Sequence, residues 1–178
     1  MSAPLLVLVG PPASGKTTVG TAVAETLGAA FRDTDHDIEA TTGSSVADLF
    51  INAGEPHFRA LEEQAVVRAL ADHDGVVALG GGSVASAATR ALLTDYVLVG
   101  GTVVWLDVDV ASAARRLGFS RDRPLLPVNP RAMLRQMLEE RAPLYGEVAT
   151  ATVATGGREP GDVVADVAAL VCAGRHVR

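Results

Sequence analysis

Residues 10–17, which read GPPASGKT, constrain the fold of this chain more than any other stretch. They satisfy the pattern G-x-x-x-x-G-K-[ST] at Gly10, Gly15, Lys16 and Thr17. The apolar run at residues 5–9 precedes them and a helical pattern follows, so they predict a strand, a phosphate-binding loop and a helix in that order. An ordinary glycine-rich turn carrying a surface lysine would not combine the whole pattern with this setting.

Lys16 is the only lysine in the chain, and every other basic residue apart from the histidines is an arginine. Arginine carries a planar fork, whereas lysine carries a compact ammonium on a flexible stem, so the contrast indicates that position 16 needs an ammonium. In a loop of this kind backbone N–H groups and the start of the helix bind phosphate. The lysine reaches the outer phosphates, and the hydroxyl of Thr17 is placed to ligate Mg²⁺.

Size and charge narrow the class of protein. The 178 residues suit one domain, and we expect a single domain over residues 1–178. The net charge of −6 argues against general nucleic-acid binding, which needs a basic surface. No apolar run is long enough to span a membrane, and residues 5–9 are too few for a targeting segment. The single cysteine, Cys172, cannot form an internal disulfide, so we expect it to lie in the core of a cytoplasmic protein.

Apolar runs rich in β-branched residues alternate with helical patterns, which predicts an α/β fold with a parallel sheet covered by helices on both faces. Strands are expected near residues 5–9, 30–32, 76–79, 102–106 and 151–154. Helices are expected from the phosphate loop to Gly28, over residues 44–53, from Glu55 onward, near residues 86–93, over residues 109–117, after Pro130, and up to Gly174.

Two of these strands end in residues suited to a ligand. Asp33 and Asp35 follow the second strand, and Gly80, Gly81 and Gly82 follow the third. Open α/β sheets bind their ligands at the carboxyl ends of the strands. The glycines indicate either a tight turn before the next helix or a backbone surface that a ligand approaches closely.

Arginines mark two further places. The helical pattern breaks over residues 118–130, and this loop carries Arg121 and Arg123, so it is either a functional lid or a solvated surface loop. In the next helix Arg141 shares the apolar stripe. An inward-facing arginine needs an anionic partner, either a carboxylate of the core or a bound ligand.

The ordered motifs resemble those of the shikimate kinase family over nearly the whole chain. They are the phosphate loop, then DTD at residues 33–35, GEPHFRALE at 54–62, LGGG at 79–82, RPLL at 123–126 and RAPLY at 141–145. The resemblance implies a three-layer fold with sheet order 2-3-1-4-5, a substrate-binding segment at about residues 33–62 and a lid at about 118–130. It also implies a monomer that uses ATP and Mg²⁺ to phosphorylate shikimate at its 3-hydroxyl, on the route to chorismate and the aromatic amino acids.

The same resemblance implies the residue roles. Lys16, Asp33 and Arg123 would act in catalysis, with Asp33 either accepting the hydroxyl proton or helping Thr17 to hold hydrated Mg²⁺. The residues implied at ATP are Gly10, Pro12, Ala13, Ser14, Gly15, Lys16, Thr17, Thr18, Arg116, Arg123, Arg158 and Pro160. Those implied at shikimate are Asp35, Phe58, Arg59, Glu62, Gly80, Gly81, Gly82 and Arg141, with Phe50 and Pro124 as further walls of the pocket.

Two rival functions stay open at this stage. A kinase for another small hydroxy acid such as gluconate would share the fold and the phosphate loop, but it would not need both aspartates, the glycine triplet and the two arginines together. A non-catalytic nucleotide-binding module would not need every one of these positions filled. One departure from the family pattern is Ala13, where relatives more often carry glycine, and we expect function to survive it because the alanine side chain is small.

Overall fold

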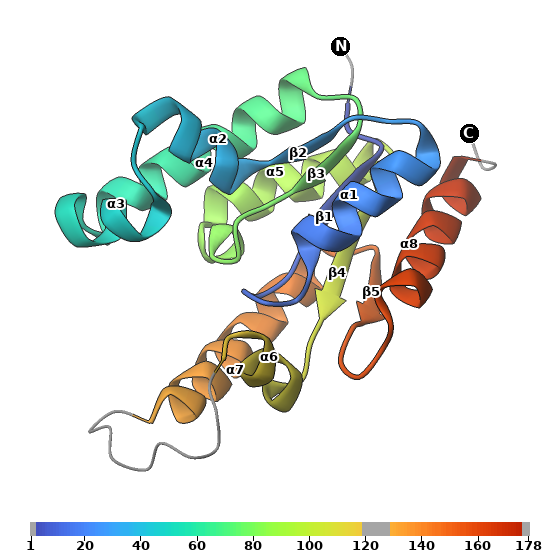
Figure 1. The fold of residues 1–178 in the computed structure, drawn as a ribbon. Helices are drawn as coiled ribbons and strands as arrows, with labels where there is room; N and C mark the ends of the chain where they lie inside the picture. Colours follow the sequence, from blue (N-terminus) through green and yellow to red (C-terminus); the bar gives the residue numbers. More distant parts are fainter. Residues whose placement is uncertain (1–2, 119–128, 176–178) are drawn as a thin grey trace.

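A single parallel sheet forms the centre of the computed structural model, which describes residues 3–118 and 129–175 (Figure 1). Its five strands follow the order β2-β3-β1-β4-β5, which confirms the order that the family resemblance implies. The strands are β1 (Leu6–Val9), β2 (Phe31–Asp33), β3 (Val76–Ala78), β4 (Val103–Asp107) and β5 (Ala151–Ala154).

Strand β1 lies in the middle of the sheet, paired with β3 on one side and β4 on the other. All four of its residues are at most 1% exposed, which explains why its sequence is continuously apolar rather than alternating. Side chains of a strand point alternately to the two faces. Leu6 and Leu8 accordingly join one core cluster, and Val7 and Val9 join the other.

Helices cover both faces, so the predicted three-layer arrangement is confirmed. The first cluster packs α1 (Lys16–Leu27) and α8 (Pro160–Arg175) against the sheet. The second packs α4 (Glu55–Asp72), α5 (Ala87–Leu98) and α7 (Pro130–Val148) against the opposite face. No helix in residues 3–118 and 129–175 is long and apolar enough to cross a membrane.

The short elements lie beside these layers. A small cluster joins α3 (Val46–Ala53) and α4 to α2 (Thr34–Thr42), the helix that directly follows β2. Helix α6 (Val110–Arg116) packs on α7, and one 3₁₀ turn, η1 (Ser83–Ala85), follows the glycine triplet. The expected ends at Gly28 and Asp109 are confirmed: Gly28 adopts the left-handed conformation after α1, and Asp109 caps the start of α6.

Two expectations need correction. The sequence predicts no helix at residues 34–42, but α2 begins there, because the side chain of Asp33 accepts a hydrogen bond from the backbone N–H of Asp35 and caps it. Cys172 is exposed rather than in the core. The buried stripe of α8 runs through Val163, Val167 and Val171, and the next residue points about 100° away from it.

Candidate active site

The predicted ligand-binding segments meet at one edge of the sheet. The phosphate loop follows β1, the glycine triplet follows β3 and Asp33 ends β2, and these three strands are neighbours in the order β2-β3-β1. Since all strands are parallel, their carboxyl ends share an edge. Three segments that are far apart in the sequence therefore border one site.

The backbone of the phosphate loop depends on its glycines. Gly10 has a φ of 151°, and a Cβ there would lie 2.6 Å from the carbonyl oxygen of Leu106. Gly15 has a φ of 96° and precedes α1, whose first N–H groups face the loop and suit an anion. Ala13 has a φ of 63°, the only positive φ of a non-glycine residue in the described ranges. The alanine thus adopts the left-handed conformation that glycine adopts most easily.

The side chain of Lys16 folds back onto this loop. Its Nζ donates hydrogen bonds to the carbonyl oxygens of Gly10 at 2.8 Å and Pro11 at 3.0 Å. Burial lowers the pKa of the Lys16 ammonium to about 8, and the charges of Asp35 and Asp33 oppose that shift. The ammonium is therefore bound to the loop, where phosphates would bind, and it is close enough to Asp33 and Asp35 to interact with their charges.

A hydrogen bond joins the side chains of Thr17 and Asp33. The Thr17 hydroxyl donates to Oδ2 of Asp33 at 2.8 Å, while Oδ1 of Asp33 accepts the N–H of Asp35 at 3.0 Å. Within the described residues no group of three or more His, Cys, Asp or Glu side chains could hold a metal ion. One carboxylate beside a phosphate loop fits Mg²⁺, which binds through one or two protein oxygens, phosphates and water.

Asp35 differs from Asp33 in its surroundings. Its Oδ1 is buried, with no hydrogen-bond partner among the described residues. Burial raises the pKa of Asp35 to about 6, and the charges of Asp33 and Glu62 raise it further against the opposing charge of Lys16. An ionised Asp35 would thus accept a hydrogen bond or a proton from a hydroxyl group placed against it.

Arg59 is held between carboxylates and aromatic rings. It donates to Glu62 at 2.6 Å and to Glu55 at 3.0 Å, and its guanidinium carbon lies 5.6 Å from the ring centres of both Phe50 and Phe58. Glu62 is 2% exposed. Phe50 and Phe58 contact each other at 4.5 Å. These contacts orient a guanidinium whose planar fork matches a carboxylate.

The glycine triplet makes room for these side chains. A Cβ at Gly80 would lie 2.6 Å from both Asp35 Oδ1 and Glu62 Oε1, one at Gly81 would lie 2.8 Å from Pro12, and one at Gly82 would overlap Arg59. The triplet forms the turn that leads into η1, which confirms the first of the two alternatives, and its close neighbours are side chains of the site. The sequence analysis missed Thr34, whose buried hydroxyl accepts the N–H of Gly80 at 2.9 Å.

Arg141 reaches the same triplet from α7. Its Nη1 donates to the carbonyl oxygen of Gly81 at 3.1 Å, and the Tyr145 hydroxyl donates to the same oxygen at 2.6 Å. None of the ion pairs among residues 3–118 and 129–175 includes Arg141. Of the two partners that the sequence left open for Arg141, a core carboxylate is thus not observed among the described residues, and its charge is available to a ligand.

Arg116, Arg158 and Pro160, which the resemblance implies at the nucleotide base, line one hollow. A hollow of about 160 Å³ lies beside the phosphate loop, lined by Ser14, Gly15, Thr18, Val19, Arg116, Thr155, Arg158, Pro160 and Val163. Arg116 donates to the carbonyl oxygens of Ala13 at 2.9 Å and Thr155 at 2.7 Å, which joins the hollow to the loop. Arg123, Pro124 and most of the expected lid lie outside the described residues.

Comparison with known proteins identifies the family of this chain. The family model described as Shikimate kinase matches residues 12–171. A shikimate kinase of Salinispora arenicola is 56% identical over 171 residues, covering 96% of this chain and 99% of the relative. One of Streptomyces coelicolor is 53% identical over 163 residues, with 92% of each chain covered.

Solved structures agree with this result. A shikimate kinase from Acinetobacter baumannii, solved in complex with shikimate, superposes with a TM-score of 0.85 at 36% identity, covering 97% of this chain and 94% of the other. A gluconokinase from Sinorhizobium meliloti superposes with a TM-score of 0.54 at 23% identity, a likeness that extends to the fold alone.

Proposed function

The chain belongs to the shikimate kinase family, and on that premise we propose that it transfers the γ-phosphoryl group of ATP to the 3-hydroxyl of shikimate. The observation that carries the proposal is the position of the glycine triplet. It packs on Pro12 of the phosphate loop while it borders Asp35 and Arg59. A phosphate donor and a small hydroxy acid would therefore be held next to each other.

Two arginines suit the carboxylate of shikimate. Arg141 has no carboxylate partner among the described residues, and Arg59 is oriented by Glu55, Glu62 and the rings beside it. A carboxylate bound by forked N–H donors forms strong, directional hydrogen bonds. The hydroxyl groups of the substrate would then face Asp35 and the backbone of the triplet, where a side chain would leave no room.

Asp35 is the better proton acceptor of the two aspartates. Both carboxylate oxygens of Asp33 are already engaged, by the Thr17 hydroxyl and by the N–H of Asp35. Among the described residues Oδ1 of Asp35 has no hydrogen-bond partner, and the pKa of Asp35 is about 6, so the carboxylate is mostly ionised at neutral pH and able to take the hydroxyl proton. We therefore assign proton acceptance to Asp35 and metal support to Asp33, which narrows the role that the resemblance implied for Asp33.

The phosphate loop and the hollow beside it would bind ATP, the phosphate donor. Loop N–H groups and Lys16 would bind the phosphates, and Arg116, Arg158 and Pro160 would surround the base. Thr17, with Asp33 through water, would hold Mg²⁺, which neutralises charge on the transferred group. Arg123 would add a further positive charge from the lid. We expect the enzyme to act as a monomer in the cytoplasm.

The test is release of ADP from ATP with shikimate and with gluconate as parallel acceptors. We expect release with shikimate, formation of shikimate 3-phosphate, and little release with gluconate. Release with gluconate alone would favour the rival kinase. Release with neither acid, from a protein that still binds ADP, would favour a non-catalytic nucleotide-binding module.

A further inference from the structure

One backbone carbonyl links three parts of the site. The oxygen of Gly81 accepts hydrogen bonds from Arg141 at 3.1 Å and from the Tyr145 hydroxyl at 2.6 Å. The same glycine packs on Pro12 of the phosphate loop, where a Cβ would come within 2.8 Å of the proline ring. Movement of this peptide would therefore disturb the substrate arginine and the contact with the phosphate loop together.

Tyr145 is placed to hold that peptide rigidly. It is 1% exposed, and its ring stacks on Trp105 with centres 5.7 Å apart. Trp105 pairs in register with Val9, the last residue of β1 before the phosphate loop. Burial raises the pKa of Tyr145 to about 12, against the opposing charge of Arg141, so the hydroxyl keeps its proton and donates at any ordinary pH.

We propose that Tyr145 is a positioning residue for the acceptor: its hydroxyl satisfies the Gly81 carbonyl, so that Arg141 can turn its N–H groups to the carboxylate of the substrate. A carbonyl has room for two donors, and a partly buried carbonyl that loses them is costly. Without the tyrosine hydroxyl, Arg141 would be the only donor to this oxygen among the described residues, and substrate binding would compete with that hydrogen bond. This inference rests on the proposed function.

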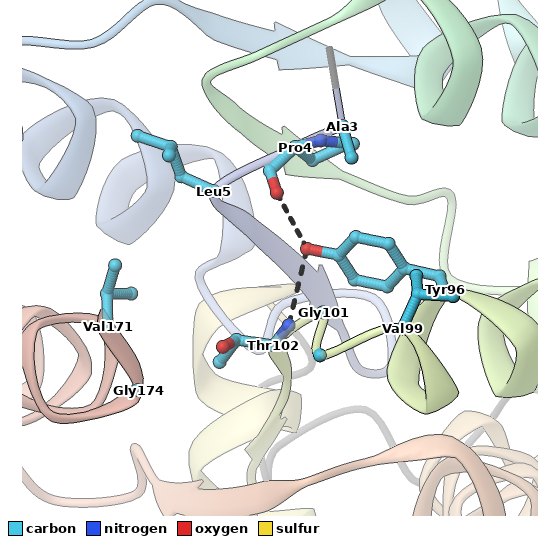
Figure 2. Close-up of a pocket in the computed structure, with 10 residues that line it drawn as sticks. Ala3, Pro4, Leu5, Tyr96, Val99, Gly101, Thr102, Val171 and Gly174 are labelled. Atoms are coloured by element: carbon cyan, nitrogen blue, oxygen red, sulfur yellow. Dashed lines mark hydrogen bonds between the residues drawn. The ribbon is translucent and has the colours of Figure 1, made fainter. Parts of the chain in front are cut away.

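The chain contains a matched control, because it has only two tyrosines. Tyr96 is 7% exposed, and its hydroxyl donates to the carbonyl of Pro4 at 2.9 Å and accepts the N–H of Thr102 at 3.3 Å. It lines a hollow of about 310 Å³ together with residues that precede β1 and β4 and residues of α8. Figure 2 shows the Tyr96 hydroxyl between Pro4 and Thr102 at this end of the sheet. The hydroxyl thus lies at the amino ends of the strands, away from the site, in a similarly buried setting.

The experiment compares Tyr145→Phe with Tyr96→Phe by calorimetric titration of shikimate and of ADP. The ADP titration also gives the fraction of each sample that is folded and able to bind. For Tyr145→Phe we expect shikimate affinity to fall roughly three- to tenfold, the scale of one hydrogen bond, with ADP affinity changed less than about twofold. For Tyr96→Phe we expect neither affinity to change, although urea unfolding should show a similar loss of stability.

A double-mutant cycle separates positioning from general packing. If Tyr145 acts through Arg141, then Tyr145→Phe should have no further effect on shikimate affinity in an Arg141→Ala background. Additive effects, an equal loss of ADP affinity, or a shikimate affinity no weaker than that of Tyr96→Phe would overturn the inference and leave the proposed function intact. Failure of the unaltered protein to bind shikimate would overturn both.

Discussion

Replacing Asp35 by asparagine should make the protein more stable at neutral pH while it removes activity. The side chain keeps its shape but loses the charge that burial and two neighbouring carboxylates, Asp33 and Glu62, disfavour. Oδ1 of Asp35 has no hydrogen-bond partner among the described residues, so no hydrogen bond offsets the cost of placing charge on this buried oxygen before a substrate binds. A functional carboxylate held in this way costs stability.

The magnitude follows from the shift in pKa. Folding raises the pKa of Asp35 from 3.8 to about 6, so the folded protein binds this proton more tightly than the unfolded chain. The group therefore favours folding below pH 3.8, and that contribution is lost as the pH rises toward 6. The free energy of unfolding of the unaltered protein should therefore be lower than that of Asp35→Asn by about 1.5 kcal/mol at pH 5 and by about 3 kcal/mol at pH 8.

Urea unfolding of both ligand-free proteins between pH 5 and pH 8 measures this difference. We expect the gap in free energy of unfolding to widen by about 1.5 kcal/mol over that range, and kcat for shikimate to fall by about a hundredfold or more. Asp95→Asn, which removes an exposed carboxylate of α5, controls for the change in net charge. A gap that stays constant with pH, or a variant less stable than the original at pH 8, would refute the reasoning.

Two further substitutions test the two halves of the site. Lys16→Arg should lower kcat by about a thousandfold or more, because the planar fork of arginine does not fit between the carbonyls that now bind the ammonium. The melting temperature should not change, and a variant that keeps most of its kcat would contradict the prediction. Gly82→Ala should raise the shikimate KM about tenfold or more and the ATP KM less than twofold, because its Cβ would displace Arg59. Gly146→Ala in α7, where a Cβ meets nothing within 4 Å, is the control and should leave both KM values unchanged.

The sheet and its ligand-binding edge could be predicted because each of their elements is marked by a short run of neighbouring residues. Strands β1, β3 and β4 are short, mostly apolar runs, and the phosphate loop combines a motif with its setting, so these elements can be recognised from the local sequence alone. Parallel pairing then brings the ends of β1, β2 and β3 to one edge. The strand order itself came from the family resemblance, since apolar runs alone do not say which strands are neighbours.

The contacts that shape the acceptor side could not be predicted, because their partners are far apart in the sequence. Thr34 binds the backbone of Gly80, and Tyr145 binds that of Gly81, at separations of 46 and 64 residues. A buried threonine or tyrosine has many explanations when only its neighbours in the chain are known. Helix α2 was missed for a related reason: its threonines and aspartates have low helix propensity, and the cap at Asp33 and the packing on α4 compensate.

The three glycines after β3 explain how two binding sites are joined without a side chain that belongs to both. Each glycine leaves space for a different neighbour: Gly80 for the carboxylates of Asp35 and Glu62, Gly81 for Pro12 of the phosphate loop and Gly82 for the guanidinium of Arg59. A Cβ at Gly80 or Gly82 would disturb the acceptor side, whereas one at Gly81 would push the two sides apart. Because Arg141 and Tyr145 both donate hydrogen bonds to the carbonyl of Gly81, we expect the placement of this one peptide to set the distance between the phosphate donor and its acceptor.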